Sequence, residues 1–403
     1  MAGIVVVGAG QAGASVVAKL RALDYAGQIT LIGEEPSPPY QRPPLSKKYL
    51  LGELELERMY LRPESFYAEN QIDLCVNEQV TSIVPGAKEI TTTGRTIEYD
   101  HLVLATGSVP RTLPAAMGGD LEGVYLVRGL SDVDAMAPEF REGAHVLIVG
   151  GGYIGLEAAA VAAKKGLKVT LIEMADRILK RVASPETSDY FRTLHQGHGV
   201  DIRESTGLER LIGEGRVTGA HLADGEELDV DFVIVGVGID PATELAAMAG
   251  LEIDNGIKTN DTCQTSAPNI WAAGDCASFP YRGDQVRLES VPNAHDMAEC
   301  VAENIMGAGK TYVPQPWFWS DQYDIKLQIS GLNTGYDNVI TRPDGKGKGM
   351  SFWYFKGDEL LAVDAVNEPR AYMVGKRLID AGKSPTPDQI ADTGLELKTL
   401  LKA

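Results

Sequence analysis

The stretch "LIVGGGYIGLEAA" at residues 147–159 decides the fold of this 403-residue chain. An apolar run typical of a buried strand breaks into three consecutive glycines and then continues as a helix-forming run. Such a unit can cradle a dinucleotide pyrophosphate, because the glycines let the backbone approach and the helix N-terminus offers unpaired N–H groups. The stretch "IVVVGAGQAGAS" at residues 4–15 has the same form. Two cradles imply either a duplication artefact or two bound nucleotides.

The similarity between the two halves extends beyond the glycines. A second apolar run follows each cradle, "QITLIGEE" at 28–35 and "KVTLIEMA" at 168–175, and a third ends in small residues, "DHLVLATG" at 100–107 and "DFVIVGVG" at 231–238. The repeat predicts the α/β class, with two Rossmann-like dinucleotide-binding units of parallel strands flanked by helices.

The segments outside the repeat have a different pattern. Alternating runs at 89–100 and 217–231 predict small antiparallel insertions. After residue 315 the chain becomes aromatic-rich and strand-like, and a helix is expected at about 368–381. This part predicts a C-terminal α+β domain without a nucleotide signature.

Charge and composition exclude several classes of function. The chain has 37 basic and 56 acidic residues, a net charge of −19, which argues against nucleic acid or an anionic membrane as partner. No run approaches the roughly 18 apolar residues of a spanning helix, and the start reads as a strand and not as a signal peptide. The four cysteines have no CxxC spacing, so we expect reduced thiols, no metal site and a soluble cytoplasmic protein.

An acidic residue follows each cradle at the end of the next strand. Glu34 lies 21 residues after Gly13, and Glu173 lies 18 residues after Gly155. A carboxylate there can hydrogen-bond the ribose hydroxyls, the alternative being a solvated charge at a strand end. Glu173 would repel a 2′-phosphate, so NADH is expected over NADPH, although the later Arg177 and Lys180 weaken this preference.

The stretch "NIWAAGDCA" at 269–277 suggests which cradle holds which nucleotide. A strand running into Gly-Asp exposes the carboxylate of Asp275, which suits a polyol such as the ribitol of a flavin; the alternative is an ordinary turn aspartate. The next helix begins near Pro292, and its positive end could stabilise a reduced flavin. His295 in its first turn has no evident partner and reads as an ordinary helix residue.

At this point the chain resembles a known family, the FAD-dependent NADH:ferredoxin reductases of the putidaredoxin reductase type in the glutathione-reductase-like superfamily. The matching stretches cover nearly the whole chain in family order: "GAGQAG", "PPYQRPPLSKKYL", "YDHLVLATGS", "HVLIVGGGYIGLE", "AAGDCA", "RLESVPNA" and "PWFWSDQYDIKLQISG". The resemblance implies an FAD-binding domain in two parts (1–112 and 240–315), an NADH-binding domain (113–239) and a C-terminal interface domain (316–403).

The resemblance also implies site residues. Those expected at FAD are Gly8, Gly10, Ala12, Gly13, Glu34, Arg42, Lys47, Val80, Ala105, Thr106, Gly107, Arg128, Asp275, Val291 and Trp319. Those expected at NADH are Gly150, Gly152, Tyr153, Ile154, Gly155, Glu173 and Gly238. Lys47 and Glu157 are the implied catalytic pair, with Lys47 beside the flavin N5; without the resemblance they would read as surface charges.

The loop "QRPPLSKKYL" at 41–50 supports a fixed position for Lys47. Two prolines rigidify the loop, and residues 45–47 are expected to open a helix. The implied reaction passes a hydride from NADH to FAD N5, with Tyr153 or another side chain moving aside for the nicotinamide. Single electrons then pass to a 2Fe-2S ferredoxin that supplies a monooxygenase or dioxygenase.

Docking of an acidic ferredoxin to a chain of net charge −19 requires a local basic area. Arg62, Arg370, Lys376 and Arg377 are candidates, whereas Glu299 stands where a basic residue would help. Trp319 is expected near the flavin edge toward the docking face, as is Trp317 unless it belongs to the C-terminal core.

Four other functions compete with this interpretation. A disulfide reductase needs two cysteines, and an NADH oxidase or peroxidase one, in the segment 41–50, which contains none. An NADH-responsive sensor and a reductase of rubredoxin stay open as alternatives.

Overall fold

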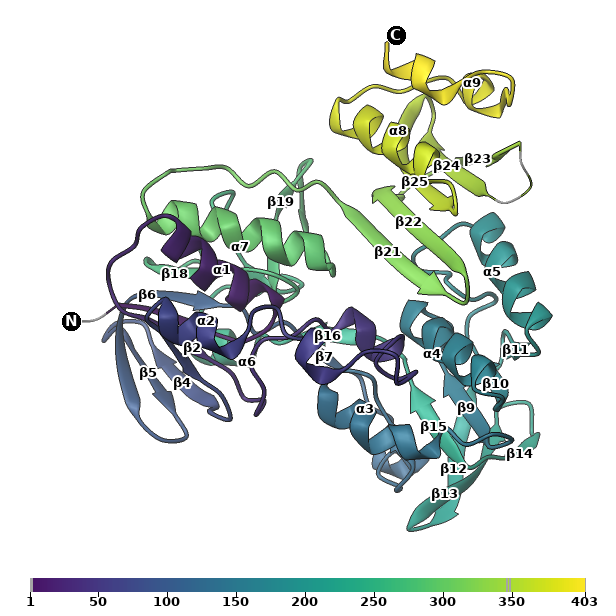
Figure 1. Cartoon of the computed structure of the whole chain (residues 1–403), viewed down its shortest axis with the longest axis horizontal. Helices are drawn as coiled ribbons and strands as arrows, with labels where there is room; N and C mark the ends of the chain where they lie inside the picture. Colours follow the sequence, from purple (N-terminus) through teal and green to yellow (C-terminus); the bar gives the residue numbers. More distant parts are fainter. Residues whose placement is uncertain (1–2, 346, 348, 403) are drawn as a thin grey trace. The chain divides into compact units, whose positions relative to one another are not determined.

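The apolar run that precedes the first glycines forms the central strand of a seven-stranded sheet. The computed structural model describes residues 3–345, 347 and 349–402, and the chain forms two units. The first unit takes Met1–Arg42, Glu55–Val109 and Ile239–Pro316, and the second takes Pro43–Leu54, Pro110–Gly238 and Trp317–Ala403. Figure 1 labels many of the helices and strands, and each unit is described by itself.

The sheet of the first unit combines parallel and antiparallel strands. Its strand order is β3-β2-β1-β6-β5-β4, with β18 pairing β6. Strands β1, β2, β3 and β18 are parallel to their neighbours, whereas β4 and β5 form an antiparallel extension of β6. The bounds are β1 Gly3–Val7, β2 Ile29–Ile32, β3 Ile72–Cys75, β4 Val80–Val84, β5 Glu89–Thr92, β6 Thr96–Leu104 and β18 Ile270–Ala272. All residues of β1 and β2 are buried, as is typical of strands covered on both faces.

Helices α1 and α7 lie side by side over this sheet (Figure 1). Helix α1 spans Gln11–Ala22, and α7 spans Val291–Ile305, with Ser290 as the N-cap accepting from Asn293 N. The remaining elements of the first unit are short. They are α2 Glu64–Glu69, α6 Glu244–Met248, β7 Ser108–Pro110, β16 Ile239–Pro241, β17 Ile257–Lys258, β19 Ala277–Tyr281 and β20 Asp284–Val286.

The second unit contains a second parallel sheet built in the same way. Its strand order is β11-β10-β9-β15-β8, and all four pairings are parallel. An antiparallel sheet β12-β13-β14 is inserted before β15, as the alternating run at 217–231 predicted. The bounds are β8 Val124–Tyr125, β9 His145–Val149, β10 Lys168–Ile172, β11 Asp201–Arg203, β12 Leu208–Glu214, β13 Arg216–Leu222, β14 Glu227–Asp229, β15 Phe232–Val235, α3 Leu130–Met136, α4 Tyr153–Lys164 and α5 Pro185–Gly197.

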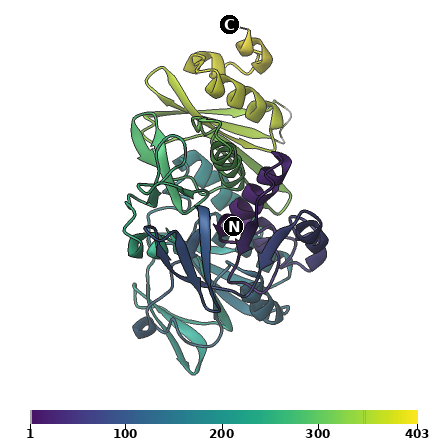
Figure 2. The ribbon, with the colours of Figure 1, turned by 90° about the vertical axis from the view of Figure 1, so that its left-hand side faces the viewer.

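The C-terminal part of the second unit is an antiparallel sheet with helices. The strands are ordered β21-β22-β25-β24-β23, and the helices that follow them, in yellow, lie together beside the sheet in both views (Figures 1 and 2). Trp353 and Phe355 of the sheet pack with Leu378 of α8 in a shared core. The bounds are β21 Trp317–Gln322, β22 Ile325–Gly331, β23 Asn338–Pro343, β24 Met350–Lys356, β25 Glu359–Val366, α8 Pro369–Asp380 and α9 Pro387–Ala391.

Two sheets with parallel strands at their glycine turns, and an α+β C-terminal part, confirm the predicted fold class. The predicted helix at about 368–381 is α8, and the predicted insertion at 89–100 is the β5–β6 pair. One local prediction is wrong: residues 45–47 open no α-helix, because a 3-10 helix spans Pro43–Ser46 and turns follow it. Within the described residues, no helix combines the length and the apolar character that crossing a membrane requires.

Candidate active site

The first glycine turn follows strand β1 and has three glycines with different tasks. Gly8 has a φ of +109°, and a Cβ there would lie 2.1 Å from Ala105 O. A Cβ at Gly13 would lie 2.0 Å from Gly8 O, whereas a Cβ at Gly10 would meet nothing within 4 Å. The first and third glycines therefore permit close backbone packing, and the second leaves open space beside the turn.

The second glycine turn, after strand β9, repeats this geometry. Gly150 also has a φ of +109°, and a Cβ there would lie 2.3 Å from Gly236 O. A Cβ at Gly155 would lie 2.2 Å from Gly150 O, and Gly152 faces open space. The agreement confirms that the two sequence motifs fold in the same way.

Helices α1 and α4 start at these turns without side-chain caps. Gly10 and Gly152 are their N-cap residues, and neither helix has a side-chain hydrogen bond at its cap. Each helix has 12 residues, so its first-turn N–H groups and its dipole favour an anion at the turn. Open space, uncapped N–H groups and close-packed glycines fit the pyrophosphate of a dinucleotide at both turns.

The acidic residues after the two cradles differ in their surroundings. Glu173 Oε2 accepts from Gly151 N at 2.8 Å, and Oε1 accepts from Ala175 N at 2.8 Å. The carboxylate of Glu173 is therefore fixed against the second turn. Glu34 lies two residues after the end of β2 and is exposed.

Asp275 lies where strand β18 ends next to the first turn. Gly274 before it has a φ of +82°, and a Cβ there would lie 3.1 Å from the Ala12 side chain on α1. The Ser108 hydroxyl donates to Asp275 Oδ2 at 3.4 Å. The half-buried Asp275 carboxylate is thus held beside the helix that starts at the first glycine turn.

Arg42 is fixed by partners that the sequence did not reveal. Its guanidinium forms an ion pair with Glu35, donates to the Tyr40 hydroxyl at 3.0 Å and stacks over the Tyr40 ring at 5.1 Å from its centroid. The other first-unit residues predicted to contact FAD line strand ends and helix starts. Ala12, Val80 and Ala105 are buried, Thr106 donates to Ala242 O, Gly107 has a positive φ, and Val291 opens α7.

Lys47 and Glu157 are in contact within the second unit. Lys47 Nζ lies 2.9 Å from Glu157 Oε1, and Glu157, on α4, is only 4% exposed. The Ser46 hydroxyl donates to Oε2 at 2.5 Å, and the Ser320 hydroxyl donates to Oε1 at 2.6 Å. Three donors therefore surround one buried carboxylate, and these contacts hold the Lys47 ammonium beside it.

Tyr153 and Ile154 open helix α4 next to the second turn. The Tyr153 ring lies 5.1 Å from the Phe318 ring, and no described group hydrogen-bonds its buried hydroxyl. Burial, and then the nearby Asp364, raise the pKa of Tyr153 well above its usual range. Ile154 is 44% exposed, and Gly238, after β15, has a φ of +112°.

The remaining predicted residues occupy varied positions. Arg128 precedes α3, and its backbone N donates to Asp132 Oδ2. The ring of Trp319 lies 5.5 Å from that of Trp317, which packs against the C-terminal core. Exposed His295 lies near Asp296 and Glu299, as expected of an ordinary helix residue.

Two of the proposed docking cations have local partners. The Arg62 guanidinium lies 5.7 Å from the centroid of the Phe66 ring, and Lys376 pairs with Asp380 at 3.0 Å.

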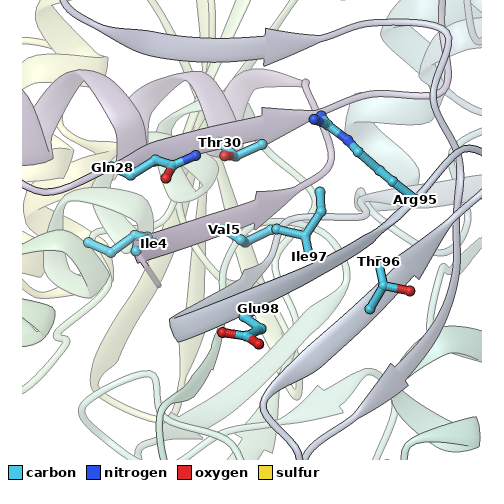
Figure 3. Close-up of a pocket in the computed structure, with 9 residues that line it drawn as sticks. Ile4, Val5, Gln28, Thr30, Arg95, Thr96, Ile97 and Glu98 are labelled. Atoms are coloured by element: carbon cyan, nitrogen blue, oxygen red, sulfur yellow. The ribbon is translucent and has the colours of Figure 1, made fainter. Parts of the chain in front are cut away.

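A hollow of about 390 Å³ opens at the other end of the first sheet (Figure 3). Its lining comes from the starts of β1, β2 and β6: Gly3, Ile4, Val5, Gln28, Thr30, Arg95, Thr96, Ile97 and Glu98. Ligands of such sheets bind outside the carboxyl ends of the strands, where the glycine turns lie. We therefore assign no cofactor to this hollow.

Comparison with known proteins identifies similar chains over the whole length. Residues 2–298 match the pyridine nucleotide-disulphide oxidoreductase family, and residues 317–401 match the reductase C-terminal family. Rhodocoxin reductase of Rhodococcus erythropolis is 41% identical, covering 98% of this chain and 93% of that protein. Putidaredoxin reductase of Pseudomonas putida is also 41% identical, over 99% of this chain and 97% of that protein. The crystal structure of the covalent putidaredoxin reductase–putidaredoxin complex matches with a TM-score of 0.96 and 40% identity, covering 100% of this chain and 98% of that chain.

Proposed function

Because the chain belongs to the pyridine nucleotide-disulphide oxidoreductase family, we propose that it is an NADH-dependent flavoprotein reductase of a 2Fe-2S ferredoxin. The observation that carries the proposal is the pair of glycine turns with equal geometry, which provide for two dinucleotides. When bound, FAD accepts a hydride from NADH and releases electrons singly. The relatives named as reductases of rhodocoxin and putidaredoxin support an iron–sulfur protein as acceptor. The ferredoxin would supply a monooxygenase or dioxygenase.

The first turn is the proposed FAD site. Asp275, held beside the start of α1, is suited to the flavin's polyol hydroxyls, and Arg42 is fixed by Glu35 and Tyr40. We assign residues 1–112 and 240–315 to FAD binding, 113–239 to NADH binding and 316–403 to the interface domain. The proposed FAD residues of the first unit are those given above. Arg128, Lys47 and Trp319, which the resemblance also implies for FAD, belong to the second unit.

The second turn is the proposed NADH site, formed by Gly150, Gly152, Tyr153, Ile154, Gly155, Glu173 and Gly238. The fixed carboxylate of Glu173 favours ribose hydroxyls over a 2′-phosphate. Arg177, which could attract that phosphate, instead donates to Ser188 Oγ at 2.7 Å. These contacts support a preference for NADH.

Lys47 and Glu157 are the proposed catalytic pair. Glu157 fixes the position of the Lys47 ammonium, because its carboxylate is buried and is itself held by the Ser46 and Ser320 hydroxyls. A fixed positive charge at Lys47 would help a flavin bound near it to accept negative charge. The role of this chain's residues is thus electrostatic.

The dithiol that the family name suggests is missing from the segment expected at the flavin. The segment 41–50 contains no cysteine. Burial raises the pKa of the Cys75 thiol to about 11 and raises that of Cys276 as well, so neither is poised as a thiolate. Electron transfer to a separate protein fits the residues better.

The partner and the location complete the proposal. We infer a cytoplasmic protein and an acidic ferredoxin as its partner. The candidate docking cations are Arg62 in the first unit and, separately, Arg370, Lys376 and Arg377 in the second. The net charge of −19 makes such a local basic area necessary, since long-range attraction to an acidic partner is absent.

The test is a two-step kinetic experiment on the purified protein. Rapid mixing with NADH under anaerobic conditions should bleach the yellow flavin, and a cognate 2Fe-2S ferredoxin should restore it and support reduction of cytochrome c. Rubredoxin and a reaction without partner serve as comparisons. A protein that stays colourless after incubation with FAD would contradict the flavoprotein proposal. Slow bleaching that no iron–sulfur protein reverses would indicate a sensor instead.

A further inference from the structure

A buried chain of hydrogen bonds connects Glu157 to helix α5. Ser320 Oγ lies 2.6 Å from Glu157 Oε1, and Gln322 Nε2 lies 3.1 Å from Ser320 Oγ. Gln322 Oε1 is 2.7 Å from His195 Nε2, and the Tyr323 hydroxyl is 3.1 Å from His195 Nδ1. Ser320 and Gln322 are 1% exposed and His195 is 0% exposed. All these residues belong to the second unit.

The chemistry of the groups fixes the direction of the chain. A carboxylate only accepts, so the Ser320 hydroxyl donates to Glu157 and its oxygen is left to accept from the Gln322 amide nitrogen. The Gln322 carbonyl oxygen then accepts from His195 Nε2–H, and His195 Nδ1 accepts from Tyr323. Burial lowers the pKa of His195 to about 4, so the ring is neutral at pH 7 and carries one proton. Every donor therefore points toward Glu157.

We propose that Gln322 and His195 are positioning residues that keep the Ser320 proton directed at Glu157. The inference rests on the proposed role of the Lys47–Glu157 pair and identifies what maintains it. A serine hydroxyl can rotate to any nearby acceptor, and only an amide nitrogen facing it leaves Glu157 as its partner. Oε1 of Glu157 binds both Ser320 and Lys47, so the hydroxyl helps to hold the oxygen that fixes the ammonium.

The sharpest test replaces one donor of the hydrogen-bond chain by an acceptor of nearly the same shape. Gln322→Glu places an acceptor where the amide nitrogen stood, which draws the Ser320 hydroxyl away from Glu157. We expect NADH to reduce the flavin about tenfold more slowly, the size of one lost hydrogen bond to a charged group. Ser320→Ala should give a similar loss, and Ser320→Thr should retain most of the rate. The NADH concentration at half-maximal rate and the FAD content should stay unchanged in all three.

A matched control is available in the adjacent strand. Ser330 on β22 is also 1% exposed, so Ser330→Ala makes the same change at a similarly buried site that takes no part in these hydrogen bonds from Glu157 to Tyr323. Its rate of flavin reduction should equal that of the unmodified protein. An equal loss in Ser330→Ala and Ser320→Ala would overturn the proposal, because general damage to the sheet would then explain both.

The tautomer of His195 provides a readout independent of activity. Long-range ¹H–¹⁵N spectra of the histidine rings should show His195 protonated at Nε2, with the signal assigned by its loss in His195→Gln. A ring protonated at Nδ1 would overturn the direction of the chain.

Glu157→Gln, measured in the same assay, separates this proposal from the proposed function. If Glu157→Gln is slow while Ser320→Ala and Gln322→Glu are as fast as the unmodified protein, only the positioning proposal fails. If Glu157→Gln itself reduces flavin at the full rate, the role of the Lys47–Glu157 pair fails, and the positioning proposal fails with it.

Discussion

The glycine turn at Gly8 and the glycine turn at Gly150 share a backbone but differ in the side chains around them. Both first glycines have a φ of +109°, and both third glycines leave no room for a Cβ. Beside the first turn, Asp275 is held next to α1, and Glu34 is exposed. At the second, Glu173 is hydrogen-bonded to the turn itself. The backbone of each turn is therefore suited to a dinucleotide, and we attribute the choice between FAD and NADH to the side chains around it.

Alanine at the first glycine of each turn should have the largest effect. A Cβ would lie 2.1 Å from a carbonyl oxygen at Gly8 and 2.3 Å at Gly150, at a φ that alanine rarely adopts. We expect a loss on the order of 2–5 kcal/mol in unfolding free energy from strain and overpacking. Gly8→Ala should also lose its yellow colour, whereas Gly150→Ala should stay yellow but react poorly with NADH. Thermal unfolding, absorbance and anaerobic mixing with NADH measure these effects.

Controls for this prediction come from glycines with a positive φ in open space. Gly283 in the first unit and Gly143 in the second have φ of +93° and +79°, and a Cβ at either meets nothing within 4 Å. Alanine at these positions should cost stability without affecting either nucleotide. Loss of flavin from both Gly8→Ala and Gly150→Ala would break the assignment of one nucleotide to each turn.

Alanine at the second glycine should have a smaller and more selective effect. Gly10 and Gly152 face open space, so the fold should change in stability by no more than about 1 kcal/mol. The added methyl group keeps a phosphate from the backbone N–H groups. Gly152→Ala should raise the NADH concentration at half-maximal rate about tenfold, as one weakened hydrogen bond to a charged group predicts. Gly10→Ala should weaken FAD retention in a dialysis assay, and the opposite pattern would exchange the two assignments.

The parts of this molecule that repeat could be predicted from the sequence. Each glycine turn is a local feature of the sequence, because its glycines lie within six positions of one another, although the first glycine packs against a distant carbonyl, that of Ala105 or Gly236. The fold class followed from the order of these turns and the apolar runs, and the family match confirms the resemblance. The contact of Lys47 with Glu157 came from the resemblance alone.

The contacts that fix the catalytic pair could not be predicted from the sequence. Ser320 is 163 positions from Glu157, and serine is too common to stand out at such a separation. The loop 43–47 also differs from its prediction, since a 3-10 helix already spans Pro43–Ser46 and ends before Lys47. Arg42 was predicted, but Glu35 and Tyr40, which hold it, were not.

The smallest expected effect concerns the acids that distinguish the turns. Glu173→Ser removes the carboxylate that accepts from Gly151 N and Ala175 N, and so frees two donors for a 2′-phosphate. The ratio of kcat/KM for NADPH to that for NADH should rise about tenfold, corresponding to roughly 1.4 kcal/mol of differential binding. Glu34→Ser should weaken FAD retention without changing that ratio, because its carboxylate follows the other turn. Steady-state rates with both nucleotides measure this effect. An unchanged NADPH-to-NADH ratio in Glu173→Ser would mean that this carboxylate only stabilises the turn.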